Sequence, residues 1–468
     1  MGGGHGTSGP TDGKDLARVM AARILASGRA PSQGRLTVTG VGNLPSVLPV
    51  TEFAAASVGA AGVAAADLAA AADGRHRDVR VDRRLASMWF AWSLRPVGWR
   101  TPSPWDDVAG DYRTCDGWIR LHTNAAAHRE AALRVLGVPG ERDPVARAVA
   151  GWEAAELETR VVEAGGCAAA MRSAAEWASG EQGRSVASEP LIAWEDGDRS
   201  GAVPTPAGGG RPLEGLRVLD LTRVLAGPVA TRFLALLGAD VLRVDPPRWD
   251  EPGLVPEVML GKRSARLDLR DARGRGRLLE LLERCDVLVH GYRPGALDGL
   301  GLGAAVRRGA RPGLVEVGLD AYGWTGPWRT RRGFDSLVQM STGIADAAMR
   351  EWGLDAPKPL PVQALDHGTG YLMAYAVLEG LRRRLDTGLG SVARLSLART
   401  ALFLTGHRAP AAPDSQTPAP ETDDDLAPGV EDTEWGPARR LRMPLEVEGV
   451  AFAAPRPAGA LGSGQARW

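Results

Sequence analysis

The chain has 468 residues, enough for two or three domains and a sizeable core. Its 56 acidic and 56 basic residues balance, so no overall field favours nucleic acid or an anionic membrane as a partner. Three widely spaced cysteines without a CxxC pair (Cys115, Cys167, Cys285), and seven histidines without an HxxxH or HExxH pattern, predict no metal site and a reducing cytoplasm. The alanine-rich stretch from Glu52 to Asp73 is too weakly apolar for a membrane span, and the N-terminus has no signal profile, so we expect a soluble protein.

The chain opens with a flexible part and a helical unit. Residues 1–34 are rich in Gly, Ser and Pro, which predicts a mobile N-terminus apart from a helix over 15–27. Residues 35–95 combine an alanine-rich helix with a turn at Asp73-Gly74 and a strand over 79–82.

Residues 96–198 are predicted to form a small mixed α/β domain. A hairpin turning at 115–117 comes first. Helical patterns and one strand follow, at 125–136, 145–164, 174–179 and 190–194. Residues 199–212 contain three consecutive glycines and predict a linker.

Residues 213–405 alternate short apolar strands with helical segments, a pattern typical of a doubly wound, mostly parallel sheet. The predicted strands cover 217–221, 241–244, 265–269, 287–290 and 314–318. The predicted helices cover 228–237, 272–284, 334–342 and 370–384. The fold class is therefore α/β, with a Rossmann-like large domain and a smaller mixed domain. Residues 406–432, rich in Pro, Asp and Glu, predict a disordered linker, and 433–468 a strand-poor C-terminal extension.

The stretch around Asp366 stands out. An apolar run from Pro359 to Leu365 reaches this carboxylate, passes Gly368 and Gly370, and enters a helical pattern. This predicts a strand end, a tight turn and a helix start, with Asp366 exposed where the positive end of a helix dipole favours its ionised form. Asp366 is then either a nucleophile or an ordinary N-cap or turn residue.

Two short cationic motifs follow predicted connections of the large domain. Lys262 and Arg263 form a compact turn before a strand, which is either a phosphate-binding turn or a solvated loop. Tyr292 and Arg293 follow a strand and precede Pro294-Gly295, which predicts either an adenine or phosphate ledge or a simple strand-to-helix turn. No GxGxxG follows the first strand, so dinucleotide chemistry loses its main support.

The segments 44–90 and 359–403 follow the same plan. In both, an apolar run leads to a carboxylate, a helix, a turn and a strand, with Glu52 in the place of Asp366. This is either an internal repeat or two unrelated strand-helix-strand units of ordinary composition.

Several motifs occur in fixed order in the large domain, and they resemble the class III CoA-transferases, the carnitine/formyl-CoA transferase (CaiB/BaiF) family. The likeness covers residues 213–404 densely, and the small domain precedes the large one here, whereas in that family it normally follows. The motifs are Arg217 to Pro228, Leu237 to Val241, Gly261 to Ser264, Tyr292 to Gly295, Gly323 to Pro327, Gly333 to Asp335 and Ala364 to Asp366.

The resemblance implies a CoA thioester site in which Asp366 is the catalytic nucleophile, forming aspartyl-anhydride and aspartyl-CoA intermediates. It implies coenzyme A as substrate with no tightly bound cofactor and no metal, and an acyl-CoA and a carboxylic acid as partners. It also implies interlocked dimers, which here become a pseudo-dimeric monomer or a homodimer. The residues assigned by it are Val224, Leu225 and Ala226 for the thiol channel, Lys262, Arg263, Arg293 and Arg332 for the CoA phosphates, Tyr292 for adenine, and Gly368, which leaves room for the thiol in a turn whose backbone N–H groups stabilise the oxyanion.

Alternatives remain within and outside that family. Some members place a histidine before the residue equivalent to Asp335 and act as racemases; Phe334 cannot move a proton, and His367 is a conceivable substitute or a turn residue. The other readings are an isomerase or dehydratase-type lyase acting on CoA thioesters, and an inactive CoA-binding paralogue. Glu52 is either an ordinary surface carboxylate or the degenerate twin of Asp366.

Overall fold

The computed structural model describes residues 13–200, 210–408 and 417–468. Parts of the predicted mobile N-terminus (1–12), linker (201–209) and disordered segment (409–416) lie outside the described residues. The predicted N-terminal helix is present as α1 (Gly13–Leu25), which buries Met20 and Ile24.

A seven-stranded sheet forms the centre of the large domain, in the order β10-β9-β8-β11-β12-β13-β7. Strands β10 to β13 along this order pair in parallel, and β7 pairs antiparallel at the edge. The order reverses direction between β8 and β11, which is the switch point of a doubly wound sheet. The predicted fold class is confirmed. The strands are β7 (Ala193–Arg199), β8 (Arg217–Leu221), β9 (Asp240–Asp245), β10 (Arg263–Arg266), β11 (Val287–His290), β12 (Val315–Asp320) and β13 (Leu389–Ser396).

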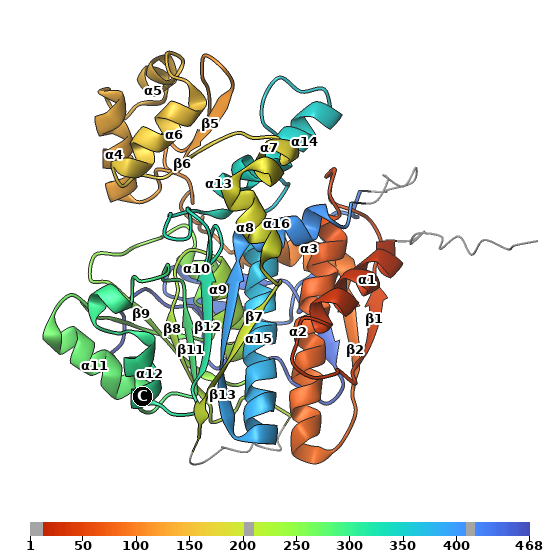
Figure 1. Cartoon of the computed structure of the whole chain (residues 1–468). Coiled ribbons are helices and arrows are strands. Elements are labelled where there is room, and N and C mark those ends of the chain that lie inside the picture. Colours follow the sequence, from red (N-terminus) through yellow and green to blue (C-terminus); the bar gives the residue numbers. More distant parts are fainter. Residues whose placement is uncertain (1–12, 201–209, 409–416) are drawn as a thin grey trace, which may run out of the picture.

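Helices cover both faces of this sheet (Figure 1). Because side chains alternate along a strand, Val218 and Val287 pack on one side with α9 (Ala226–Leu236) and α15 (Ala364–Thr387). Leu219 and Leu288 pack on the other side with Leu278 and its neighbours on the flanking helices. Those helices are α11 (Ala272–Leu282) and α12 (Ala304–Ala310), and the connections carry α10 (Val255–Val258), η1 (Asp298–Leu300), α13 (Asp335–Ser341) and α14 (Ile344–Glu351).

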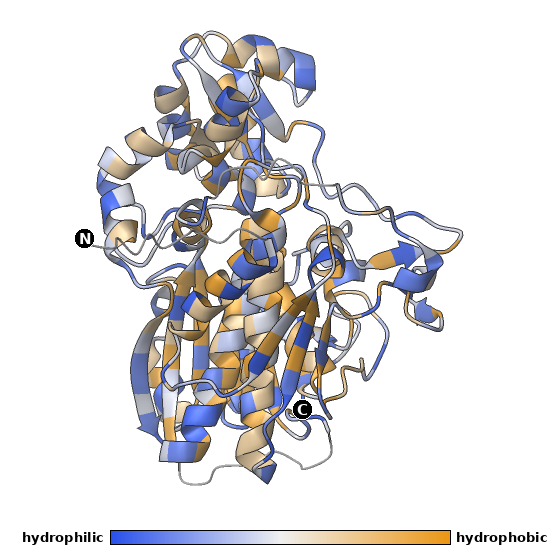
Figure 2. Ribbon diagram, turned by 90° about the vertical axis from the view of Figure 1, so that its right-hand side faces the viewer, coloured by the Kyte–Doolittle hydropathy of each residue, from blue (hydrophilic) through white to orange (hydrophobic). Residues whose placement is uncertain are grey.

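A second unit packs against the outer side of α15. Its three-stranded sheet contains β1 (Arg35–Thr39), β2 (Asp78–Asp82) and β16 (Leu445–Val447). Helix α2 (Val50–Asp73) lies between this sheet and α15, and the two long helices run side by side in Figure 1. Within the described residues α2 alone is long and apolar enough to cross a membrane, but 94% of its apolar window is buried in the core. Figure 2 shows the same concentration of apolar residues on the central helices and strands.

The segments 44–90 and 359–403 contain the same succession of helix, strand and helix. Helices α2 and α15 each have 24 residues, and each ends at a left-handed glycine, Gly74 (φ 73°) and Gly388 (φ 71°). Each is followed by a strand and then a nine-residue helix, α3 (Arg83–Ala91) and α16 (Leu397–Thr405). Since both long helices start two residues before the carboxylate, Glu52 and Asp366 occupy the same helical position.

The small domain stands over the ends of the large sheet (Figure 1). The predicted hairpin is confirmed, with β6 as a third antiparallel strand. The predicted helix over 145–164 is wrong, because it breaks near Gly151 into α5 and α6. The elements are β4 (Gly110–Arg113), β5 (Trp118–Leu121), β6 (Ala168–Ala170), α4 (Ala126–Leu136), α5 (Arg142–Val149), α6 (Ala154–Glu163), α7 (Ala174–Ser179) and α8 (Glu181–Ser188).

The C-terminal segment is less strand-poor than predicted, and it ties the units together. β15 (Gly436–Arg440) pairs with β14 (Glu431–Thr433) and with β3 (Leu94–Pro96), next to the short η2 (Asp423–Asp425). The Trp468 indole donates to the Leu281 carbonyl at 2.9 Å, which fastens the chain end to α11.

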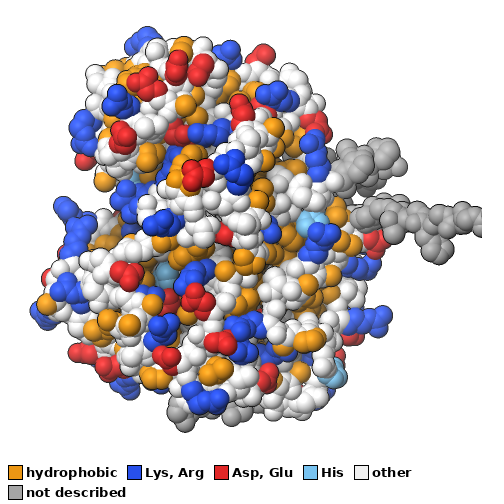
Figure 3. Space-filling model, viewed as in Figure 1, with side chains coloured by type: hydrophobic (Ala, Val, Ile, Leu, Met, Phe, Trp, Pro, Cys, Tyr) orange, Lys and Arg blue, Asp and Glu red, His pale blue; other side chains and the backbone are white. Residues whose placement is uncertain are grey.

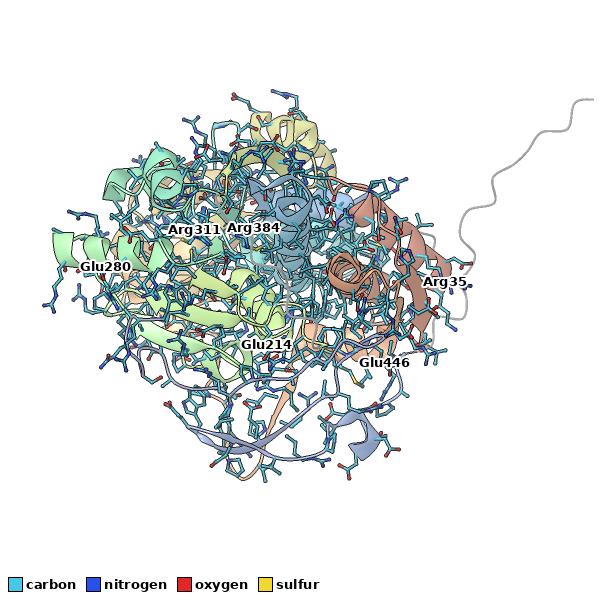
Figure 4. All side chains as sticks on the ribbon, turned by 90° about the horizontal axis from the view of Figure 1, so that it is seen from below. Arg35, Glu214, Glu280, Arg311, Arg384 and Glu446 are labelled. Carbon is cyan, nitrogen blue, oxygen red and sulfur yellow. The ribbon has the colours of Figure 1, made fainter. Side chains whose placement is uncertain are left out.

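Ion pairs close the amino ends of the parallel strands. Figure 4 views this end, where Arg311 and Arg384 lie close together. Both donate to Asp286 Oδ1 at 3.3 Å, and Asp286 Oδ2 accepts the Arg217 N–H at 3.0 Å where β8 begins. These bonds tie the amino ends of β8 and the strands beside it to α15.

Candidate functional site

A cavity of about 1070 Å³ lies at the carboxyl ends of the six parallel strands, under the small domain. Each of these strands contributes residues at or just past its end to the lining. The space-filling view shows the molecule hollowed between the small domain and the body, with basic side chains nearby (Figure 3). A crevice beyond the carboxyl ends at a switch point is where doubly wound sheets bind ligands.

Asp366 lines this cavity from the first turn of α15. The prediction of a strand end and a glycine turn is wrong, because the helix begins at Ala364 and the preceding residues form no strand. The side chain is 6% exposed rather than open to solvent. Asp366 thus combines burial with the favourable end of a helix dipole.

A second carboxyl group, Asp335, holds that first turn. Its Oδ2 accepts the Asp366 backbone N–H at 2.9 Å, and it also accepts the N–H of Leu365. The Gln339 side chain donates to Oδ1. Asp335 is 2% exposed, so these bonds form in a medium of low polarity.

The two carboxyl groups perturb each other. Burial raises the pKa of Asp335 to about 6. Burial, followed by the charge of Asp335, raises the pKa of Asp366 well above its ordinary range. Two buried carboxyl groups that repel each other do not both ionise easily, so the charge on one raises the pKa of the other. When ionised, Asp366 is a desolvated and more basic carboxylate.

The start of α9 lies beside Asp366. A Cβ on Gly370, one turn along α15, would come within 2.5 Å of the Ala226 carbonyl oxygen, so this glycine permits the close approach of the two helices. Val224 precedes α9 with φ 67°, the only described non-glycine residue with a positive φ. Val224, Leu225 and Ala226 all line the cavity, as the thiol-channel prediction requires.

The cavity is rich in arginine. Five guanidinium groups in its lining form no ion pair with any carboxylate of the described residues: Arg223, Arg248, Arg270, Arg293 and Arg332. Tyr292 also lines the cavity, and the Arg223 guanidinium lies 5.5 Å from its ring and 4.9 Å from the Trp249 ring. Unpaired guanidinium groups next to aromatic rings are suited to an anionic ligand that also carries a flat ring.

Lys262 and Arg263, predicted to contact phosphate, lie elsewhere. The Lys262 side chain is fully buried, with Nζ 3.2 Å from Asp220 Oδ2 and 2.8 Å from the Pro228 carbonyl. Burial lowers its pKa to about 8. Arg263 pairs with Asp240 at 2.7 Å and donates to the Arg467 carbonyl. Neither residue lines the cavity, so both assignments are corrected: these cations bind protein groups and are not available to phosphate.

Gly368 and His367 also differ from their predicted roles. Gly368 lies inside α15, and a Cβ there would come within 2.1 Å of the Phe53 ring. Its missing side chain therefore makes room for α2 and not for a thiol, and its N–H belongs to the helix. The His367 ring is buried and stacks on Phe90 at 5.1 Å, and burial lowers its pKa to about 3. It does not line the cavity and is no substitute base there.

Phe334 faces the small domain. Its ring stacks on His122 at a centroid distance of 3.7 Å and lies 5.9 Å from His128. Burial lowers the pKa of His122 to about 3 and that of His128 to about 4, so both imidazoles are neutral at neutral pH. His128 lines the cavity together with Phe334. Residues of both domains therefore form one site.

Sequence reasoning missed several lining residues. Asp335 lies within one of the family motifs, but nothing in its local sequence pattern indicates a hydrogen bond to Asp366, 31 residues later in α15. Arg223 and Arg270 could have been found, since each follows a predicted strand within a few residues, at the edge where ligands bind. Arg248, Trp249 and Asp320 follow or end strands in the same way.

The equivalent position in the first unit is closed. Glu52 is ion-paired with Arg83, and the Arg83 guanidinium also donates to Asn43. Both charged side chains of the pair are 6% exposed, so the prediction of a surface carboxylate at Glu52 is wrong. Glu52 lines neither described cavity, so the arrangement is a buried ion pair and not a second open site.

Residues 213–437 match the sequence model of CoA-transferase family III. An acyl-CoA transferase of Gibberella moniliformis is 32% identical over 307 residues, which cover 59% of this chain and 53% of that protein. The succinyl-CoA:glutarate CoA-transferase of Mus musculus is 37% identical over 193 residues, covering 38% of this chain and 44% of that protein. The chain spans about half the length of the curated relatives it matches.

Among solved structures, the crystal structure of a hypothetical protein from Mycobacterium tuberculosis is similar. The two sequences are 32% identical in the matched region, which covers 43% of this chain and 58% of that protein. The TM-score of the superposition is 0.40.

Proposed function

Because this chain belongs to CoA-transferase family III through residues 213–437, we propose that it moves CoA from an acyl-CoA thioester to a free carboxylic acid, with Asp366 as the nucleophile. The observation that carries the proposal is the position of Asp366: a buried carboxylate of raised pKa in the lining of an arginine-rich cavity. Desolvation makes the ionised carboxylate a stronger nucleophile, as covalent catalysis requires.

The proposed reaction has four steps that need no redox cofactor. The Asp366 carboxylate attacks the thioester carbonyl carbon and expels CoA thiolate, giving an aspartyl-acyl anhydride. The thiolate attacks the Asp366 carbonyl carbon, giving an aspartyl-CoA thioester and releasing the donor acid as its carboxylate. The acceptor carboxylate then attacks that thioester, and the expelled thiolate attacks the acceptor carbonyl. The product acyl-CoA leaves and Asp366 is restored as a carboxylate, with no net proton transfer.

The start of α9 supplies donors for the oxyanions in these steps. The N–H groups of Ala226 and Gly227 lie in the first turn of that helix, where no carbonyl of the helix can accept them. The contact between Gly370 and the Ala226 carbonyl brings this turn close to the turn that holds Asp366. The glycine turn after Asp366, predicted for this role, is helical, so we assign the oxyanion donors to α9 instead.

CoA is the substrate that the cavity accommodates. Arg223, Arg248, Arg270, Arg293 and Arg332 are our candidates for its phosphates, with Tyr292 and Trp249 for adenine. The apolar side chains of Val224, Leu225 and Ala226 line the route proposed for the thiol.

We also propose that each chain carries one active site. The first unit has the same succession of elements as α15 and its neighbours, but its carboxylate, Glu52, is held in a buried ion pair with Arg83. Residues 35–95 thus serve as a degenerate partner that packs α2 against α15, which makes a pseudo-dimeric monomer the simplest assembly. The three cysteines are free thiols, in keeping with a reducing cytoplasm.

A racemase mechanism has less support. It needs a second proton carrier opposite Asp366, and Phe334 occupies the motif position where a histidine would stand. The experiment that tests CoA transfer is incubation with an acyl-CoA followed by hydroxylamine. A hydroxamate on Asp366 supports the proposal, and an unmodified Asp366 together with α-proton exchange in the acyl group favours the racemase.

A further inference from the structure

Asp320 is an acidic residue in the cavity lining that the proposed reaction does not use. It ends β12, is 5% exposed, and faces the same cavity as Asp366. Its Oδ1 accepts the Gly323 N–H at 2.7 Å, while Oδ2 is buried and has no hydrogen-bond partner among the described residues. An unsatisfied carboxyl oxygen is costly inside a protein and is seldom retained without a ligand to satisfy it.

Among the residues that the structure describes, no cation forms an ion pair with this carboxyl group. The charged side chain that acts on the pKa of Asp320 is Glu189. Its Oε1 accepts the N–H groups of Trp324 and Thr325 at 2.9 and 2.8 Å. Burial, with a smaller contribution from Glu189, raises the pKa of Asp320 well above its ordinary range. Burial therefore favours the protonated form of Asp320, and a protonated aspartate in an apolar site can donate a hydrogen bond through its O–H.

Short links connect Asp320 to the nucleophile. The next residue, Ala321, accepts the Ala398 N–H at 2.9 Å, which holds the start of α16 against the end of β12. Thr369 lies one turn beyond Asp366 on α15, and its hydroxyl donates a hydrogen bond to the Thr400 hydroxyl of α16 at 2.8 Å. Leu319, Ala321 and Leu397, next to Asp320 at the ends of β12 and β13, also line the cavity. These neighbours of Asp320 in the lining are apolar.

We infer that Asp320 determines substrate specificity: its carboxyl group donates a hydrogen bond to a second oxygen on the chain of the acid that exchanges CoA. The substrate class is a carboxylic acid bearing a hydroxyl, an oxo group or a second carboxylate, in preference to an unsubstituted fatty acid. The inference rests on the proposed function, because the chains of the donor acyl group and of the acceptor acid occupy the same wall in turn. A polar group built to meet a substrate oxygen penalises the analogue that lacks it, since the donor is then left buried and unpaired.

The test compares acceptors of equal length with one acyl-CoA donor: butanoate, 3-hydroxybutanoate and succinate. For the unmodified protein we expect kcat/KM for at least one oxygenated acid to exceed that for butanoate by about tenfold or more. In Asp320→Leu this ratio should fall to about one. Asp320→Asn keeps a donor and should keep most of the preference for the hydroxy acid.

Two results would overturn the inference while leaving the proposed function intact. One is equal kcat/KM for all three acids with the unmodified protein, which requires no variant to fold. The other is an unchanged ratio in Asp320→Leu. Hydroxylamine trapping on Asp366 is measured in parallel with each protein, so a loss of trapping and of all transfer identifies failure of the proposed function itself.

Discussion

The backbone N–H of Asp366 donates to Oδ2 of Asp335 at 2.9 Å, so one buried carboxylate fixes the helical turn that carries another. The nucleophile is oriented by the group whose charge also opposes its ionisation. Position and basicity of Asp366 are therefore coupled through a single neighbour.

Asp335→Asn tests that coupling. Removing the neighbouring charge lowers the pKa of Asp366, although burial, the larger cause, remains. Since the reaction needs the carboxylate, kcat/KM rises with pH through this pKa, and the acidic limb of its pH profile should move to lower pH in the variant. We expect a plateau about tenfold lower, because the amide accepts the Asp366 N–H less strongly. Asp355→Asn, on an exposed loop, is the control; an unshifted acidic limb in Asp335→Asn would contradict the coupling.

Glu52→Gln and Asp366→Asn form a matched pair at equivalent helical positions. Glu52→Gln leaves the buried Arg83 cation without its carboxylate, so we expect the free energy of unfolding to fall by about 3 kcal/mol while turnover per folded molecule is unchanged. Denaturant unfolding and kcat measure the two effects. A large loss of kcat with intact stability would instead make Glu52 part of a working site.

Asp366→Asn should have the opposite effect. A raised folded-state pKa means that Asp366 favours folding below its unfolded pKa, and that this contribution is lost as pH rises through the folded pKa. The variant does not titrate, so its stability relative to the unmodified protein should grow with pH, by about 1 kcal/mol at pH 8. Transfer should fall to background while CoA still binds. An equal stability difference at pH 4 and pH 8 would refute the pKa argument.

Gly368→Ala tests the contact between the two repeated units. The new methyl group would collide with the Phe53 ring, so we expect a loss of about 2 kcal/mol. In a Phe53→Ala background the same change should cost much less, which a double-mutant cycle of unfolding free energies measures. Gly276→Ala is the control, because that glycine lies in α11 with nothing near its Cβ position and should be neutral or stabilising. Equal costs for Gly368→Ala in both backgrounds would exclude the predicted contact.

Arg332→Gln and Lys262→Met separate cavity cations from buried ones. We expect Arg332→Gln to weaken CoA binding by about tenfold, and by less at high salt, because Arg332 lines the cavity without a carboxylate partner. Lys262→Met should leave the affinity of the folded protein unchanged and reduce its stability, since Asp220 loses its buried partner. Calorimetric titration with CoA at two ionic strengths measures both. A loss of affinity confined to Lys262→Met would restore the original phosphate assignment.

Much of the fold was predictable, because it depends on local patterns. The strands over 217–221 and 287–290 were placed at their observed bounds, since short apolar runs between turn residues are distinctive. The start of α15 was missed because Gly368 and Gly370 suggest a turn, whereas they are helical and permit contact with Phe53 and Ala226. Such close approaches are tertiary features that no local pattern carries.

The order of the site motifs along the chain could be read from the sequence. Which charged side chains line the cavity and which are paired in the core could not. Arg293 and Lys262 look alike in sequence, each a cation in a short turn near a strand, yet one lines the cavity and the other is paired in the core. Only the fold shows that Asp220 lies within reach of Lys262, 42 residues away. The pairing of Asp335 with Asp366 has the same origin.

Trapping of the covalent intermediate tests the central claim most directly. The full chain is incubated with an acyl-CoA, treated with hydroxylamine, digested, and its peptides are analysed by mass spectrometry, with Asp366→Asn as the control. The account predicts a hydroxamate on Asp366, at most one per chain, with none on Glu52 and none in the control. A hydroxamate on another residue, or CoA transfer retained by Asp366→Asn, would contradict it.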